Sequence, residues 1–268
     1  MKLTRRVALN GKQLDNVDDR IVISSVEPGD GRENITAVDA ASGYGQRVTG
    51  NRRSTLDMVV KFRILEHGHT KSGMQGRAEV LEKVNAWAAE GGVLTVNYKP
   101  ERRLNVILAQ APGEGSLWDY TKEYTMTFRA YAIPYWEQEN AQSITFGGSS
   151  ATGNGTAAVD GSAKTQLKAE LYNNSGKEIN TATVRIGPNV MEFTNLALAG
   201  AETLVIDHTS NGLVRIRIRS ASGGYRSAMA ARSTSSANDF MVTPGNIACS
   251  YTAQRACRLT VSWRARYL

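Results

Sequence analysis

The sequence predicts a mainly β protein in two parts, an α+β part followed by an all-β part. Apolar and polar residues alternate in several segments, as in strands with one buried face. A single segment has clear helical spacing, and the 25 glycines indicate many turns. The length of 268 residues exceeds the ~100–150 of most single domains, so we expect two domains, and 41% hydrophobic residues is ample for their cores.

The first half begins with a segment that we interpret as a long polar loop, around Gly29–Gly50. Two alternating strands are predicted at Leu56–Ile64 and Glu123–Ile133. Shorter strands are predicted at Leu94–Tyr98 and Leu104–Ala109. This order favours an antiparallel sheet with one helix inserted after its first long strand.

The helix is predicted within residues 74–92. Ala78, Leu81, Val84 and Ala88 recur at three- and four-residue spacing, so they share one face. Ser72 is a candidate N-cap, and Gly91–Gly92 would end the helix.

The second half is predicted to be all strand. Alternation is seen at Val184–Ile186, Thr203–Asp207, Leu213–Arg219 and Arg258–Tyr267, with Gly, Asn and Pro turns between strands. Such short strands favour a β-sandwich of jelly-roll type, with no helix beyond residue 140.

A boundary between the two parts is predicted near Glu137–Phe146, which gives domains of residues 1–140 and 141–268. The composition then changes: residues 147–162 are rich in Gly, Ser and Ala. We interpret this segment either as a flexible linker or as the loop-rich start of the second domain.

Arginines dominate the charge of the C-terminal third. From Gly200 onward there are nine arginines, no lysines and three acidic residues, in a chain of formal net charge +7. Outward strand positions hold the arginines at 215, 217, 219, 264 and 266. Compatible partners for them are phosphates, an acidic protein, a phosphorylated cell-wall polymer or water. Trp263 and Tyr267 alternate with them toward the core, which argues against base stacking and sequence-specific nucleic-acid binding.

No motif for catalysis or metal binding emerges. His67 and His69 lack a third ligand in the sequence, and Asp207 and His208 would point to opposite faces of a strand. The sequence has neither a G-x-S-x-G elbow nor a P-loop. We therefore expect no enzymatic activity, no cofactor and no metal.

Cys249 and Cys257 would face each other if the seven residues between them formed a hairpin turn. The N-terminus has no apolar signal region, and no apolar stretch approaches the ~20 residues of a membrane helix. We therefore expect a cytoplasmic chain with reduced thiols and no membrane insertion.

Several segments together resemble the distal tail protein (Dit) family of bacteriophages with long, non-contractile tails. They are STLDMVVKFRI, VNAWAAEGGVLTVNY and RRLNVILAQAP, followed by FRAYAIPYWEQ, in which a strand ends in an Ile–Pro–aromatic corner. In the second half the NNSG, IGPN and VTPGN turns fit the family's C-terminal sandwich. The similarity rests on order and spacing and spans essentially the whole chain.

The resemblance implies a structural virion protein. It implies an N-terminal tail-tube-like antiparallel sandwich with one helix, forming a hexameric ring or two stacked rings, and a galectin-like C-terminal sandwich. The ring would join the tail tube to the tail-tip hub, with the tape-measure protein in its channel and receptor-binding proteins or host glycans outside. Localisation would be the tail tip of the virion, after assembly in the host cytoplasm.

The resemblance also suggests contact residues. A long arm at Glu27–Arg53 would reach into the neighbouring subunit. Candidates for the ring contact or for the core beneath it are Phe62, Tyr98, Tyr131, Tyr135 and Trp136, and candidates for a glycan or partner contact are Tyr225 and Tyr251. Two alternative functions are a carbohydrate-binding adhesion protein that recognises host glycans, and a cell-wall hydrolase, for which the sequence shows no carboxylate pair or metal triad.

Overall fold

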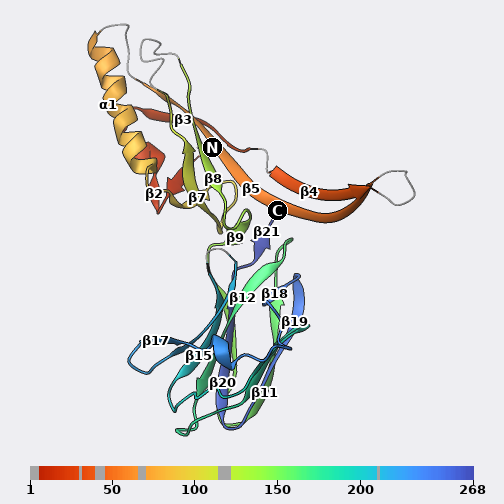
Figure 1. The fold of residues 1–268 in the computed structure, drawn as a ribbon. Helices are drawn as coiled ribbons and strands as arrows, with labels where there is room; N and C mark the ends of the chain where they lie inside the picture. The colour runs from red at the N-terminus through yellow and green to blue at the C-terminus, as the bar shows by residue number, and fades with distance from the viewer. Residues whose placement is uncertain (1–5, 30–31, 40–45, 66–70, 114–121, 210–211) are drawn as a thin grey trace. The chain divides into compact units, whose positions relative to one another are not determined.

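The computed structural model describes residues 6–29, 32–39, 46–65, 71–113, 122–209 and 212–268 (Figure 1). The chain forms two compact units, Met1–Trp136 and Glu137–Leu268. Strands predominate in both, and the pairings between neighbouring strands are antiparallel, which confirms the predicted mainly β class.

Unit 1 is built on a sheet with strand order β2-β1-β6-β7-β8-β5-β3. Its elements are β1 (Val7–Leu9), β2 (Lys12–Gln13), the 3-10 turn η1 (Leu14–Asn16), β3 (Ile21–Pro28), β4 (Arg32–Asp39), β5 (Gln46–Ile64), α1 (Lys71–Ala88), β6 (Gly92–Val96), β7 (Arg102–Gln110) and β8 (Tyr124–Ala130). The predicted order of strand, helix and three strands is therefore present as β5-α1-β6-β7-β8.

Helix α1 packs on the sheet through one face. Val80, Leu81, Val84 and Ala88 are buried, and Trp87 meets Phe128 of β8 edge-on with ring centroids 5.9 Å apart. The helix already includes Ser72, so this residue is not the N-cap. Gly91, at φ +63°, follows the last turn in the left-handed conformation that glycine tolerates best.

The predicted polar loop at Gly29–Gly50 is wrong, because most of it is a two-stranded ribbon. Strand β4 pairs antiparallel with the first half of β5, from Arg32 opposite Thr55 to Asp39 opposite Gln46. In Figure 1 this ribbon projects from the rest of unit 1 as an orange pair of strands. The second half of β5 continues into the sheet, where it pairs with β3 and β8.

Unit 2 is a sandwich of two antiparallel sheets. One has the order β10-β20-β12-β15-β16-β17, with β18 beside β12, and the other has the order β11-β19-β13-β14. Their strands are β10 (Gln142–Gly147), β11 (Thr152–Val159), β12 (Thr165–Asn173), β13 (Ala182–Ile186), β14 (Asn189–Phe193), β15 (Thr203–His208), β16 (Val214–Arg219), β17 (Tyr225–Ser227), β18 (Met241–Val242), β19 (Gly245–Ala253) and β20 (Cys257–Trp263), with one 3-10 turn, η2 (Met229–Ala231). Two short strands, β9 (Trp136–Gln138) and β21 (Arg266–Tyr267), pair with each other and belong to neither of these sheets.

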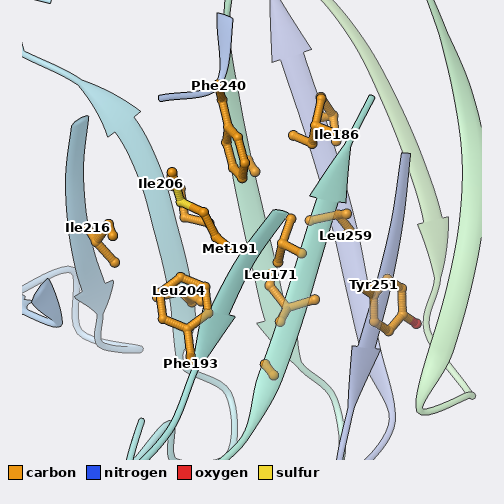
Figure 2. Packing of buried hydrophobic residues seen from close by; sticks show 14 of the residues in the cluster. Leu171, Ile186, Met191, Phe193, Leu204, Ile206, Ile216, Phe240, Tyr251 and Leu259 are labelled. Atoms are coloured by element: carbon orange, nitrogen blue, oxygen red, sulfur yellow. The ribbon is translucent and has the colours of Figure 1, made fainter. Parts of the chain in front are cut away.

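The core of unit 2 lies between these two sheets. Figure 2 shows side chains from both sheets meeting there, including Leu171 and Leu259 from one sheet and Ile186 and Tyr251 from the other. In β12 and β20 buried inward side chains alternate with more exposed outward ones, as the sequence predicted for the segment that forms β20.

Residues 147–162 are not a linker, because Thr152–Val159 form strand β11, which pairs with β19 along its whole length. The inward positions hold Gly153, Gly155, Ala157 and Val159. A Cβ on Gly153 would lie 2.6 Å from the Tyr251 ring, and one on Gly155 would lie 2.7 Å from the Phe146 ring. Glycine is therefore required where aromatic rings cover the strand.

Cys249 and Cys257 do not face each other across a hairpin. Cys249 lies on β19 and Cys257 on β20, and these strands belong to different sheets. Both cysteines are free and buried in the core.

Candidate interaction surfaces

The outward face of the unit 1 sheet carries exposed apolar side chains. Ile107 of β7 is 50% exposed and lies opposite Arg129 of β8. Arg129 makes a two-pronged ion pair with Asp57 of β5, with both N–O distances 2.6 Å, and its guanidinium lies 5.8 Å from the ring centroid of Tyr131. Tyr131 is 51% exposed, so this candidate ring-contact residue is available at the surface.

Tyr98, which follows β6, is a second exposed candidate, with 45% of its surface accessible. Partial burial and the nearby carboxylate of Glu27 raise the pKa of its hydroxyl, so the side chain is a neutral hydrogen-bond donor at physiological pH. An aromatic residue with a polar tip suits an interface that is partly wet.

Two further candidates for the ring contact lie deeper. Trp136 is 2% exposed, and the Lys99 ammonium lies 5.4 Å from its ring centroid. Tyr135 is half-buried and follows the buried Pro134. The aromatic–proline corner thus packs within the chain, and the interpretation of Trp136 as a surface contact does not fit its position.

The two candidates for a glycan or partner contact differ sharply in burial. Tyr225 is 50% exposed on the edge strand β17, with the guanidinium of Arg217 4.2 Å from its ring centroid. Tyr251 is 2% exposed, stacks on Phe146, and donates its hydroxyl hydrogen to the backbone carbonyls of Cys257 and Ser150. Tyr251 is a core residue, so its interpretation as a glycan contact does not fit its position.

The arginines of β16 do point outward, but acidic residues on neighbouring strands pair with them. Asp207 of β15 accepts hydrogen bonds from Arg215 at 2.8 and 2.9 Å and from Arg217 at 2.8 Å. Burial of Asp207 opposes its ionisation, but the two guanidinium groups outweigh that effect and lower its pKa. Arg219 lies 3.3 Å from the carboxylate of Glu170 on β12.

Arg266 is not on the outward face, contrary to prediction. It is 4% exposed, lies 3.3 Å from the carboxylate of Glu137, and donates to the side chain of Gln166 at 2.8 Å. Strand β20 ends at Trp263, and both Ala265 and Arg266 are buried. The alternation therefore changes phase within this segment, which the continuous pattern of the sequence conceals.

A shallow hollow of about 290 Å³ opens on strands β13, β14 and β19. Threonines 181, 183, 194 and 252 line it together with Glu192 and Gln254, and its floor includes the buried Phe193. An exposed aromatic platform, which sugar sites commonly use, is not among its lining residues.

Catalytic or metal chemistry gains no support in the part of the chain that the structure describes. His67 and His69 lie outside the described residues. Asp207 is engaged by arginines, while burial lowers the pKa of His208. Among the described side chains no group of three His, Cys, Asp or Glu residues is placed to hold a metal ion. In the described part of the chain, no helix has the length and the apolar composition that crossing a membrane requires.

Sequence reasoning placed Arg258 outward but missed the tyrosine that lies beside it. Tyr172 of β12 is directly opposite Arg258 of β20, and the Arg258 guanidinium lies 5.2 Å from the Tyr172 ring centroid. The alternation of Thr165–Asn173 indicates that Tyr172 points outward. Its neighbours, however, depend on strand pairing that the sequence alone does not give.

Comparison with known proteins identifies a related fold. No family model matches the chain, and no curated protein matches it. The crystal structure of SPP1 Dit (gp 19.1) is similar over 98% of this chain and 99% of that one, with 12% identity and a TM-score of 0.69. Two structures of the phage p2 baseplate in its activated conformation, one with Ca and one with Sr, are similar over 98% of this chain and over 98% and 99% of those chains, respectively. Each shares 9% identity with this chain, and the TM-scores are 0.47 and 0.45. On the strength of the first comparison, this chain has the fold of a phage distal tail protein along nearly its whole length, and the resemblance inferred from sequence is confirmed at the level of the fold.

Proposed function

We propose that this protein is a structural component of a bacteriophage tail tip. The observation that carries the proposal is the whole-chain likeness to SPP1 Dit, a protein described as a paradigm of the hub adsorption apparatus in phages that infect Gram-positive bacteria. A likeness that includes both units supports a shared architecture rather than a shared module. In this proposal the protein acts by assembly and not by catalysis, within the virion and, before that, in the host cytoplasm.

The proposed assembly is a hexameric ring, single or in two stacked copies. Residues 1–140 form the ring, and residues 141–268 form a galectin-like domain that contacts other tail or host components. The ring joins the tail-tube protein to the tail-tip hub and leaves a channel for the tape-measure protein and DNA.

Two features of unit 1 support a ring. In the described strands β4 pairs with β5 alone, so its other edge presents backbone N–H and C=O groups to a strand of a neighbouring subunit. Ile107 and Tyr131 add exposed apolar area on the sheet. A ring closes only through contacts between two different patches of each subunit, and an arm on one side with a sheet on the other supplies two such patches. For a permanent ring we expect more than ~2,000 Å² buried per contact.

Native mass tests the proposal. Light scattering of the purified full chain, over a range of protein and salt concentrations, should give six or twelve times 29.1 kDa. Tyr131→Ala should reduce the assembled fraction, because its side chain lies on the proposed contact face. Tyr225→Ala is the matched control, since it removes an equally exposed tyrosine, 50% against 51%, from unit 2.

A monomer calls for one more measurement, because such rings can also close on the tube. Co-sedimentation with tail-tube and hub proteins of the same phage then decides. A chain that is monomeric and binds neither would overturn the proposal, as would equal loss of assembly in the Tyr131→Ala and Tyr225→Ala variants.

A further inference from the structure

The outward face of the larger unit 2 sheet gathers cations from three strands. We call it the basic face: Lys168 on β12, Arg215, Arg217 and Arg219 on β16, and Arg258 on β20. The strand register places these residues on one side of the sheet. Arg258 is opposite Tyr172, Tyr172 is opposite Thr203, and Thr203 is opposite Arg219. Directly opposed residues of antiparallel strands share a face.

Two carboxylates on the basic face neutralise only part of this charge. Asp207 is shared by Arg215 and Arg217, and Glu170 is shared by Lys168 and Arg219. Five cations against two anions leave a formal excess of positive charge. Arg215 and Lys168 each keep 42% of the side chain exposed, and Arg219 keeps 38%. The face therefore retains accessible cations after its internal ion pairs are made.

Two tyrosines orient two of the guanidinium groups. Arg217 lies 4.2 Å from the ring centroid of Tyr225, and Arg258 lies 5.2 Å from that of Tyr172. Stacking uses the flat face of a guanidinium and leaves its N–H edge able to donate to phosphate oxygens. The rings thus reduce the conformational freedom that each arginine would lose on binding an anion.

The spacing of the cations suits a chain of phosphates rather than a single one. Residues two apart on β16 are roughly 6.6 Å apart, and neighbouring strands are about 4.8 Å apart. Hydroxyl side chains extend the same face, where Thr260 and Thr145 lie on neighbouring strands with their oxygens 2.9 Å apart. Such hydroxyls are suited to hydrogen bonds with a hydroxylated ligand.

We propose that the basic face binds a polymer of polyol units linked by phosphodiesters, the chemistry of anionic cell-wall polymers. Single-stranded nucleic acid shares the phosphates but relies on base stacking. On this face a guanidinium already lies against each tyrosine ring, whereas the Thr145 and Thr260 hydroxyls are present for polyol groups. The inference goes beyond the tail-tip role and is independent of it, because the face lies within unit 2 and needs no ring.

The test is isothermal titration calorimetry of the full chain with a synthetic glycerol-phosphate oligomer, repeated at several salt concentrations. Binding should weaken steeply as salt rises, because each phosphate contact releases counterions. Removing one arginine should weaken binding about fivefold, so the double variant Arg219→Gln/Arg258→Gln should lose roughly 25-fold. Arg185→Gln is the matched control, since Arg185 is an exposed strand arginine on the other sheet.

Three outcomes would overturn the inference: no binding of the oligomer by the wild type, equal losses in Arg185→Gln and the double variant, or tighter binding of a single-stranded DNA oligonucleotide of equal phosphate number. Hyaluronate, which carries carboxylates and no phosphate, gives a further comparison. Weaker binding of hyaluronate than of the oligomer supports recognition of phosphate, and equal binding argues against it. Native mass, measured in parallel, separates loss of assembly from loss of polymer binding.

Discussion

Substituting alanine for Gly155 should destabilise unit 2 because the new Cβ would overlap an aromatic ring. This Cβ would lie 2.7, 3.0 and 3.2 Å from three ring atoms of Phe146, where carbon atoms prefer ~3.5–4.0 Å. The ring is partly buried, packs against the core and stacks on Tyr251 with centroids 6.1 Å apart, so it must shift against these neighbours to make room.

The expected cost follows from two opposing effects. Overpacking a core costs about 1–3 kcal/mol. Alanine restricts the unfolded chain more than glycine does, which offsets about 0.4–1 kcal/mol. We therefore expect unfolding of unit 2 to become easier by ~1–2 kcal/mol, with a Tm lowered by roughly 3–6 °C per kcal/mol for a unit of this size.

Differential scanning calorimetry of the full chain measures the Tm, and amide hydrogen exchange in β11 and β19 reports on unit 2 directly. Gly224→Ala is the control, because its added Cβ would meet only the flexible end of Ser220, at 3.4 Å. Phe146→Leu should partly relieve Gly155→Ala, so the double variant should be more stable than the sum of the single losses predicts. If Gly155→Ala unfolds at or above the wild-type temperature, the steric argument is wrong.

Three further predictions concern buried polar groups and thiols. Asp18→Asn should cost about 2 kcal/mol, since Asp18 is 8% exposed and its carboxylate accepts charged hydrogen bonds from Arg20 at 2.8 Å and Lys83 at 2.8 Å. Those bonds, chiefly from Arg20, lower the pKa of Asp18. The stabilisation from the Asp18 carboxylate is therefore present above pH 3.8 and is lost as the pH falls through the folded-state pKa. In urea titrations, the free energy of unfolding should fall less between pH 7 and pH 2 in the variant than in wild type. Tyr251→Phe should cost about 0.5–1.5 kcal/mol in urea unfolding, because the hydroxyl no longer donates to the carbonyls of Cys257 and Ser150, although each keeps a backbone N–H donor; an unchanged midpoint would contradict this. Burial raises the pKa of Cys257 to about 11 and also raises that of Cys249. Both thiols should therefore resist iodoacetamide at pH 8 until urea unfolds the chain, and mass spectrometry of the protein measures the extent of labelling.

The sequence predicts those strands whose two faces differ in polarity. The segments that became β8, β16 and most of β20 alternate clearly, because one face of each meets a core. The ribbon of β4 and β5 escaped detection, since residues 46–55 include a single large apolar residue, Val48. Strand β11 escaped because Gly153 and Gly155 occupy its inward positions, and glycine gives no hydrophobic signal.

The surface was harder to predict than the fold, because it depends on which strands are neighbours. Alternation correctly placed Arg215, Arg217 and Arg219 outward. The acids that share their charge come from β12 and β15, and the rings that stack on the basic face come from β12 and β17. A residue's own sequence context gave no indication of these partners, and the same is true of the burial of Trp136 and Tyr251.

The sandwich of unit 2 is closed by its first and last strands. Strand β10 pairs with β20, so that Thr145 and Thr260 touch across 115 residues of sequence, and β11 likewise pairs with β19. During synthesis, therefore, neither sheet can be completed until nearly the whole unit has left the ribosome, whereas strands β1 to β8 of unit 1 have all been made by residue 130. Truncations that remove β20 would leave β10 and β12 with unpaired edges and expose the core, so shortened chains are expected to aggregate rather than to lose a dispensable tail.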